Sequence, residues 1–124
     1  MKDEEDSGSG VEDLKARTKK YALRVLRLFV ALPKSDEARI LGKQLLRSAT
    51  SVGAQYREAR RAKSDADFIS KVEGALQELE EAGYWLELIA EGDICAAPRL
   101  QPLMLETNEL ISILVTIVKK AKGL

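Results

Sequence analysis

The sequence contains no histidine and a single cysteine, Cys95, among its 124 residues. The commonest general base of enzymes is therefore missing, and an intramolecular disulfide is impossible. Helical bundles build two-metal sites from Glu-x-x-His motifs, which are excluded as well. The eight glycines are isolated and form no phosphate-binding loop. We therefore expect a protein that is not an enzyme and that has no catalytic residues, metal or cofactor.

Long apolar runs are also absent. No stretch reaches the roughly 18 apolar residues that a membrane span requires. The N-terminus is acidic, where a secretion signal would be basic and then apolar. These features predict a cytoplasmic protein without a membrane partner. Proline and glycine are scarce, and abundant Leu, Ala, Glu, Lys and Arg favour helix over strand.

Apolar residues recur at helical spacing in four segments. A chain of 124 residues is long enough to form one domain with one hydrophobic core. The first segment ends before Pro33, and Ser35 and Ser64 are suitable N-caps for the second and third. The predicted helices cover residues 12–32, 36–62, 65–91 and 97–121. Short connections predict an all-α, up-down-up-down antiparallel four-helix bundle over residues 12–124. Residues 1–11 are acidic and rich in Ser and Gly, which predicts a disordered tail.

The fourth helix is more apolar than a small bundle requires. One apolar stripe is enough to face a core, yet the segment 110–118 has apolar residues on more than one face. An exposed apolar patch usually marks an interface. We therefore expect the chain to form a homo-oligomer, with candidate interface residues Trp85, Ile113, Val115 and Ile117.

Charge is distributed unevenly, although the formal net charge is zero. Residues 12–63 carry 14 Lys/Arg and 5 Asp/Glu, whereas residues 64–124 carry 5 and 11. The two halves could neutralise each other inside the bundle. Alternatively, part of the basic surface stays free for an anionic partner. Glu73, Glu80 and Glu87 repeat every seven residues, and we expect them to be solvated or paired with the basic helices.

Basic residues on the second helix are the main functional signal. Some lie four residues apart on one helix face, and the others gather at the helix end. Converging positive charge is the principal requirement for phosphate binding, and the scarcity of aromatics argues against recognition by base stacking. The candidate nucleic-acid-binding residues are Arg39, Lys43, Arg47, Arg57, Arg60, Arg61 and Lys63. Lys15, Lys19 and Arg27 of the first helix could extend this surface.

The segment 44–59, QLLRSATSVGAQYREA, resembles a bacterial family of four-helix proteins encoded in intervening sequences of 23S ribosomal RNA genes. The resemblance continues through the motifs SDADFISK (64–71), ALQELEE (75–81) and YWLEL (84–88), and covers about residues 12 to 122. The family usually has Asn at the position of Gln55. The most specific part of the resemblance is the Ser-Val-Gly-Ala stretch of residues 51–54.

The resemblance implies a four-helix bundle that assembles into a ring-like homopentamer. A related group, the accessory variability determinants of retroelements, assists reverse transcriptases and meets nucleic acid through a basic surface. The family has no established catalytic residues. Two hypotheses follow for this chain. It is either an oligomeric scaffold that contacts RNA or ribosomes, or a protein-only interaction module or accessory subunit of a nucleic-acid enzyme such as a reverse transcriptase.

Overall fold

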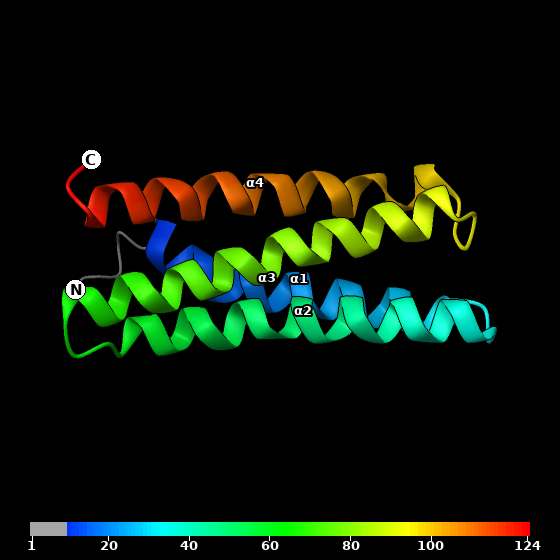
Figure 1. Cartoon of the computed structure of the whole chain (residues 1–124), viewed down its shortest axis with the longest axis horizontal. Coiled ribbons are helices and arrows are strands. Elements are labelled where there is room, and N and C mark those ends of the chain that lie inside the picture. Colours follow the sequence, from blue (N-terminus) through cyan, green and yellow to red (C-terminus); the bar gives the residue numbers. More distant parts are fainter. Residues whose placement is uncertain (1–9) are drawn as a thin grey trace.

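The computed structural model describes the backbone of residues 10–124 and the side chains from Leu14 onward. Four α-helices make up the described chain, and no strand occurs among these residues (Figure 1). They are α1 (Gly10–Ala31), α2 (Asp36–Arg60), α3 (Asp65–Glu91) and α4 (Ala97–Ala121). The prediction of an all-α four-helix bundle is confirmed.

The predicted helix boundaries are accurate to within two residues. Helix α1 begins at Gly10 instead of residue 12, and α2 ends at Arg60 instead of residue 62. The predicted disordered tail falls mainly on residues 1–9, which lie outside the described residues. None of the helices described is long and apolar enough to cross a lipid bilayer.

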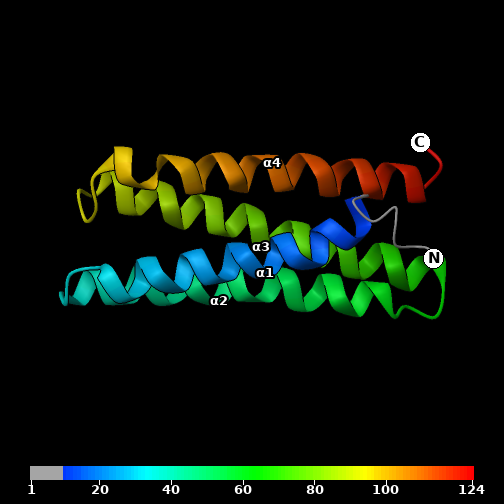
Figure 2. The same cartoon turned by 180° about the vertical axis from the view of Figure 1, so that it is seen from behind.

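The four helices run antiparallel in sequence order, but their packing is unequal (Figures 1 and 2). Helix α2 packs most closely against α3, whereas the backbones of α1 and α4 approach each other at few points and these helices meet mainly through side chains. Among the described residues, α1 makes no close backbone approach to α3, so these two helices lie at diagonally opposite corners. The bundle is therefore tight on its α2–α3 side and open between α1 and α4.

The core follows the predicted apolar stripes. Tyr21, Val52, Leu79 and Leu114, one from each helix, are almost fully buried. The Tyr21 hydroxyl donates to Thr107 Oγ1 at 2.6 Å, because the Thr107 hydroxyl itself donates to the Leu103 carbonyl at 2.8 Å. Burial raises the pKa of Tyr21 to about 12. This chain of two hydrogen bonds connects α1 to α4 through the core.

Side-chain caps fix the starts of two helices. Ser35 Oγ accepts from the Ala38 amide, and Ser64 Oγ accepts from the Asp67 amide at 3.0 Å. At the end of α3, Asp93 adopts the left-handed conformation with φ of 60°, and the Ile94 amide donates back to the Ile89 carbonyl. This is the Schellman arrangement that ends many helices. The left-handed residue here is Asp93, whereas Gly92 before it has a φ of −83°.

Small residues on α2 bring α1 close. A β-carbon on Gly42 would lie 2.9 Å from Phe29 Cδ1, and one on Gly53 would lie 3.2 Å from Thr18 Oγ1. Thr18 directs its hydroxyl to the Leu14 carbonyl of its own helix. Gly53, the glycine of the Ser-Val-Gly-Ala stretch, therefore permits close helix packing. This packing compensates for the helix propensity of glycine, which is about 1 kcal/mol less favourable than that of alanine.

Candidate nucleic-acid interface

The seven basic residues predicted from the sequence do not form one surface. Arg39 and Arg60 lie 21 residues apart on one straight helix, which corresponds to about 32 Å at 1.5 Å per residue. The candidates therefore divide between the two ends and the middle of α2. Arg39 and Lys43 lie near its start, Arg47 lies in its middle, and the others lie at its end.

Two of the seven candidates are engaged by carboxylates. Arg39 pairs with Asp36 of its own helix at 2.8 Å. Arg47 contacts Glu78 and Glu81 of α3 at 3.4 and 3.0 Å. Hydrogen bonding and charge attraction from Glu78, supported by Glu81, raise the pKa of Arg47. In the middle of α2, the basic and acidic halves therefore neutralise each other, as one of the two sequence interpretations expects.

At the other end of α2, positive charge accumulates without partners among the described carboxylates. Arg57, Arg60 and Arg61 surround a hollow of about 150 Å³ together with Lys15 of α1. We call these four residues the basic end cluster. No described carboxylate lies within ion-pairing distance of any of them, since the ion pairs of the described side chains all involve other cations. Lys63 lines a neighbouring hollow beside Asp65.

The helix order explains how this cluster forms. The start of α1, the end of α2 and the end of α4 lie at the same end of the bundle, on the left in Figure 1. Lys15 on the first turns of α1 therefore meets the last turn of α2, although 42 residues separate it from Arg57 in the sequence. Of the two lysines of α1 that could extend the surface, the structure thus adds Lys15 to the cluster.

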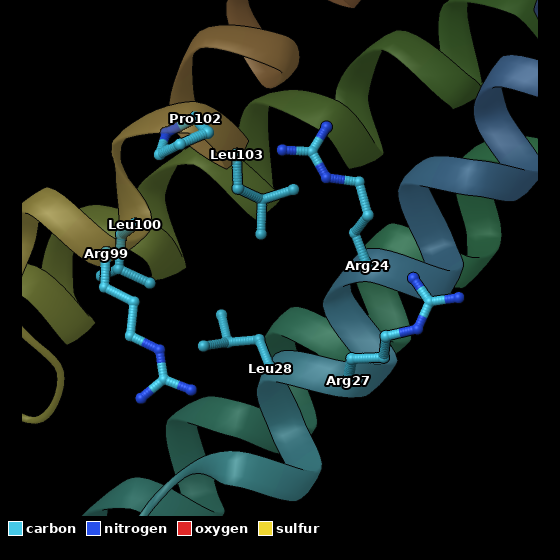
Figure 3. A pocket seen from close by; sticks show the side chains of 7 residues that line it. All are labelled: Arg24, Arg27, Leu28, Arg99, Leu100, Pro102 and Leu103. Atoms are coloured by element: carbon cyan, nitrogen blue, oxygen red, sulfur yellow. The ribbon is translucent and has the colours of Figure 1, made fainter.

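The open side of the bundle contains a second group of arginines. Arg24 and Arg27 of α1 and Arg99 of α4 line a hollow of about 270 Å³ between the two helices (Figure 3). The apolar side chains at this hollow are Leu28, Leu100, Pro102 and Leu103. The sequence interpretation did not select Arg24 and Arg99. Lys20, Arg24 and Arg27 are spaced by four and three residues, which indicates that they share one face of α1. Only the tertiary fold shows that Arg99 of α4 lines the same hollow as Arg24 and Arg27.

Farther along the same groove, one ion-pair group connects α1 to α4. The Arg17 guanidinium donates to both carboxylate oxygens of Glu106, at 2.8 and 2.9 Å, and also to Glu109. The hydrogen bonds from Arg17, together with its charge, hold the pKa of Glu106 below its ordinary value. Because the backbones of α1 and α4 approach each other at few points, this group and the Tyr21–Thr107 hydrogen bond are the main polar connections between them.

The lowered pKa of Glu106 predicts a dependence of stability on acid. A carboxylate with a depressed folded pKa stabilises the fold above its unfolded pKa of about 4.3, and this contribution is lost as pH falls through the folded value. We expect Glu106→Gln to lower the free energy of unfolding by about 1 kcal/mol at pH 7. In urea titrations the difference from wild type should shrink as pH falls below the unfolded pKa of about 4.3 and on through the lower folded value. Asp36→Asn, which removes an exposed pair, serves as the control and should show a smaller difference; a Glu106→Gln difference independent of pH would contradict this account.

The four candidate interface residues are less exposed than the sequence suggests. Trp85, Ile113, Val115 and Ile117 are all half-buried, and all except Val115 pack against the core. Ile113 and Val115 flank the buried stripe of α4, where they are partly covered and keep only part of their surface exposed. The large apolar residues with the most exposed surface inside helices are Val30, Ile40, Leu105 and Tyr84. Their role in self-association remains a prediction.

The comparisons with known proteins agree with this architecture. A family model described as 23S rRNA-intervening sequence protein matches residues 13–116. The chain belongs to this family. A crystal structure of a protein of unknown function from the S23 ribosomal protein family of Bacteroides thetaiotaomicron is also similar. It shares 35% sequence identity with a TM-score of 0.80, over 85% of this chain and 97% of that one. No curated protein matches this chain.

The fold of this member of the 23S rRNA-intervening sequence family brings no metal-ligand cluster together among the described residues. Glu73 pairs with Lys122 of α4 at 2.8 Å, whereas Glu80 and Glu87 are exposed on α3. Cys95 is half-buried in the connection between α3 and α4. The chemistry that the described surface offers is therefore chiefly electrostatic: two groups of arginines and a row of glutamates.

Proposed function

We propose that this protein is a non-enzymatic, cytoplasmic homo-oligomeric scaffold, pentameric as the family resemblance implies, that binds the phosphate backbone of RNA. The observation that carries the proposal is the basic end cluster, in which Lys15, Arg57, Arg60 and Arg61 surround one hollow. Phosphate oxygens would supply the acceptors that the described carboxylates do not. Arginine suits this role because its planar guanidinium can bind two phosphate oxygens at once.

The composition of the cluster supports backbone contact without sequence readout. Among the described residues, the hollow is lined by no aromatic side chain on which a base could stack. Contacts to phosphate position a nucleic acid but carry no sequence information. An oligomer would repeat the cluster in each protomer, and several weak sites on one RNA gain avidity when the RNA spans them. Binding should therefore be salt-dependent, weakly sequence-dependent and stronger for longer RNA.

Four ion-pair groups that join different helices favour the alternative of a protein-only module or an accessory subunit, one of them being the Arg17 group between α1 and α4. Arg47 is held by α3, Lys71 pairs with Glu58 at 3.3 Å, and Lys122 pairs with Glu73. These contacts neutralise charge within the bundle, as expected for a module that needs no polyanion. They leave the basic end cluster untouched, which is why we favour RNA.

The test is a titration of fluorescent single-stranded and duplex RNA with the purified protein. At about 50 mM salt, where phosphate contacts are strong, we expect Arg57→Glu with Arg61→Glu to weaken binding at least about tenfold. The slope of log affinity against log salt should fall by about one for each phosphate that the variant no longer neutralises.

A matched control carries the same charge change elsewhere on α2. Arg39→Glu with Lys43→Glu also reverses two charges, but at the opposite end of the helix, and it should change affinity by less than about threefold. An equal loss in both variants would mean that net charge, and not the basic end cluster, governs binding. Absence of wild-type binding at about 50 mM salt would leave the protein-only module as the better function.

A further inference from the structure

The outward face of α3 presents one aromatic ring within a row of glutamates. Glu80, Tyr84, Glu87 and Glu91 step by four, three and four residues, so they share one helix face, and all four are exposed. Tyr84 is 55% exposed, and its ring rests against the half-buried Trp85 with centroids 5.3 Å apart. The three glutamates have no ion-pair partner among the described side chains. We call this surface the acidic face.

The groove between α1 and α4 has the opposite character. Arg24, Arg27 and Arg99 lie around the hollow, and Leu28, Leu100 and Leu103 lie between them (Figure 3). None of the three arginines forms an ion pair with a described carboxylate. Arg24 acts on Glu106 only at longer range, since Arg17 occupies that carboxylate. We call this surface the arginine groove.

From these two surfaces we infer that the acidic face of one copy of this chain docks into the arginine groove of the next. Tyr84 would enter the hollow and pack against its leucines, and Glu80 and Glu87 would meet the arginines around it. A ring placed beside a guanidinium also gains a cation–π contact. Tyrosine and arginine are among the residue types that most often anchor protein interfaces. The inference rests on the proposed self-association and names the surfaces that produce it.

The positions of the two surfaces determine the kind of assembly. Helices α1 and α3 occupy opposite corners of the bundle, so the arginine groove and the acidic face point in different directions. A contact between two different surfaces is heterologous: it closes into a ring or continues as a filament, and does not form an isologous dimer. The acidic face and RNA both complement the charge of the arginines. The leucines of the hollow favour a second copy as the occupant, because Tyr84 can pack against them and an RNA backbone has no apolar group that would.

The experiment measures mass in solution by light scattering during size-exclusion chromatography, on the full chain of 13.7 kDa per protomer. We expect the wild type to run as one closed oligomer. Arg27→Glu with Arg99→Glu reverses the groove, and Glu80→Arg with Glu87→Arg reverses the acidic face. Each pair should raise the dissociation constant at least about tenfold, because like charges then oppose each other across the contact.

The decisive variant carries all four substitutions in one chain. It restores opposite charges across the contact with the signs exchanged, so it should return the mass to that of the wild type. Tyr84→Ala, which changes no charge, should also weaken assembly. Far-UV circular dichroism checks that each variant remains helical.

The outcomes separate the two proposals. A wild type with the mass of one protomer at micromolar concentration would overturn the proposed self-association and the inference together. An oligomer that survives both charge reversals would overturn the inference alone. If Arg27→Glu with Arg99→Glu abolishes RNA binding but leaves the oligomer intact, the arginine groove would be assigned to RNA, and the inference would again be overturned.

Discussion

Leu79→Ala should lower the free energy of unfolding by about 2–5 kcal/mol, a large share of the 5–15 kcal/mol typical of a folded domain. Leu79 has no exposed surface and lies in the core on α3, the helix that packs against both α2 and α4. Removing three heavy atoms there leaves a cavity that rigid neighbouring helices fill only in part. At about 4 °C per kcal/mol, we expect Tm to fall by about 8–20 °C.

The matched control for this prediction is the same chemical change at the surface. Leu105 of α4 is 59% exposed, and Leu105→Ala should alter stability by less than about 0.5 kcal/mol. Both variants are compared with wild type at one protein concentration, because assembly makes Tm depend on concentration. Equal effects of the two substitutions would show that Leu79 does not occupy the core.

Thr107→Val should cost about 1–3 kcal/mol, because it leaves a buried hydroxyl without a partner. The substitution preserves shape but removes the acceptor of the Tyr21 hydroxyl, which is 2.6 Å away between α1 and α4. The Tyr21 side chain is almost completely buried, so water offers its hydroxyl a poor substitute for Thr107. Urea unfolding followed by circular dichroism measures the loss.

A double-mutant cycle identifies the cause of that loss. Tyr21→Phe with Thr107→Val removes both hydroxyls at once, and we expect it to recover most of the stability that Thr107→Val alone removes. Strict additivity of the two single substitutions would show that the hydroxyls do not interact. The cycle is informative here because α1 and α4 pack against each other so sparsely that few other routes could couple the two sites.

Much of the fold could be predicted from the sequence because helix formation is local. The apolar residues recur at the spacing of one helix face, and Ser35 and Ser64 cap their helices as expected. The boundaries differ by two residues because helix ends depend on a few hydrogen bonds that the periodic pattern does not encode. Which residue after α3 takes the left-handed conformation, Asp93 and not Gly92, is likewise a detail that the periodic pattern does not encode.

The candidate site was predictable only in part, because ion pairing depends on distances between helices. Arg47 and Arg57 look alike in the sequence, ten residues apart on α2. Arg47 reaches Glu81 of α3 at 3.0 Å, whereas Arg57 joins the basic end cluster. The exposure of the α4 interface candidates could not be read from the sequence for a related reason: Ile113 is half-buried beside the core, and hydropathy alone does not show how far a neighbouring helix covers a side chain.

The sequence by itself determined the helices, their order, the absence of histidine chemistry and the family to which the chain belongs. Those properties depend on residue types and on spacing within single helices. The tertiary structure alone decided which cations pair with the described carboxylates and where the bundle opens. Close packing of α2 on α3 brings Glu78 and Glu81 to Arg47, and the separation of α1 from α4 leaves a hollow that Arg24 and Arg99 line from different helices. Charges on different helices attract according to distance and burial, which only the packed bundle fixes.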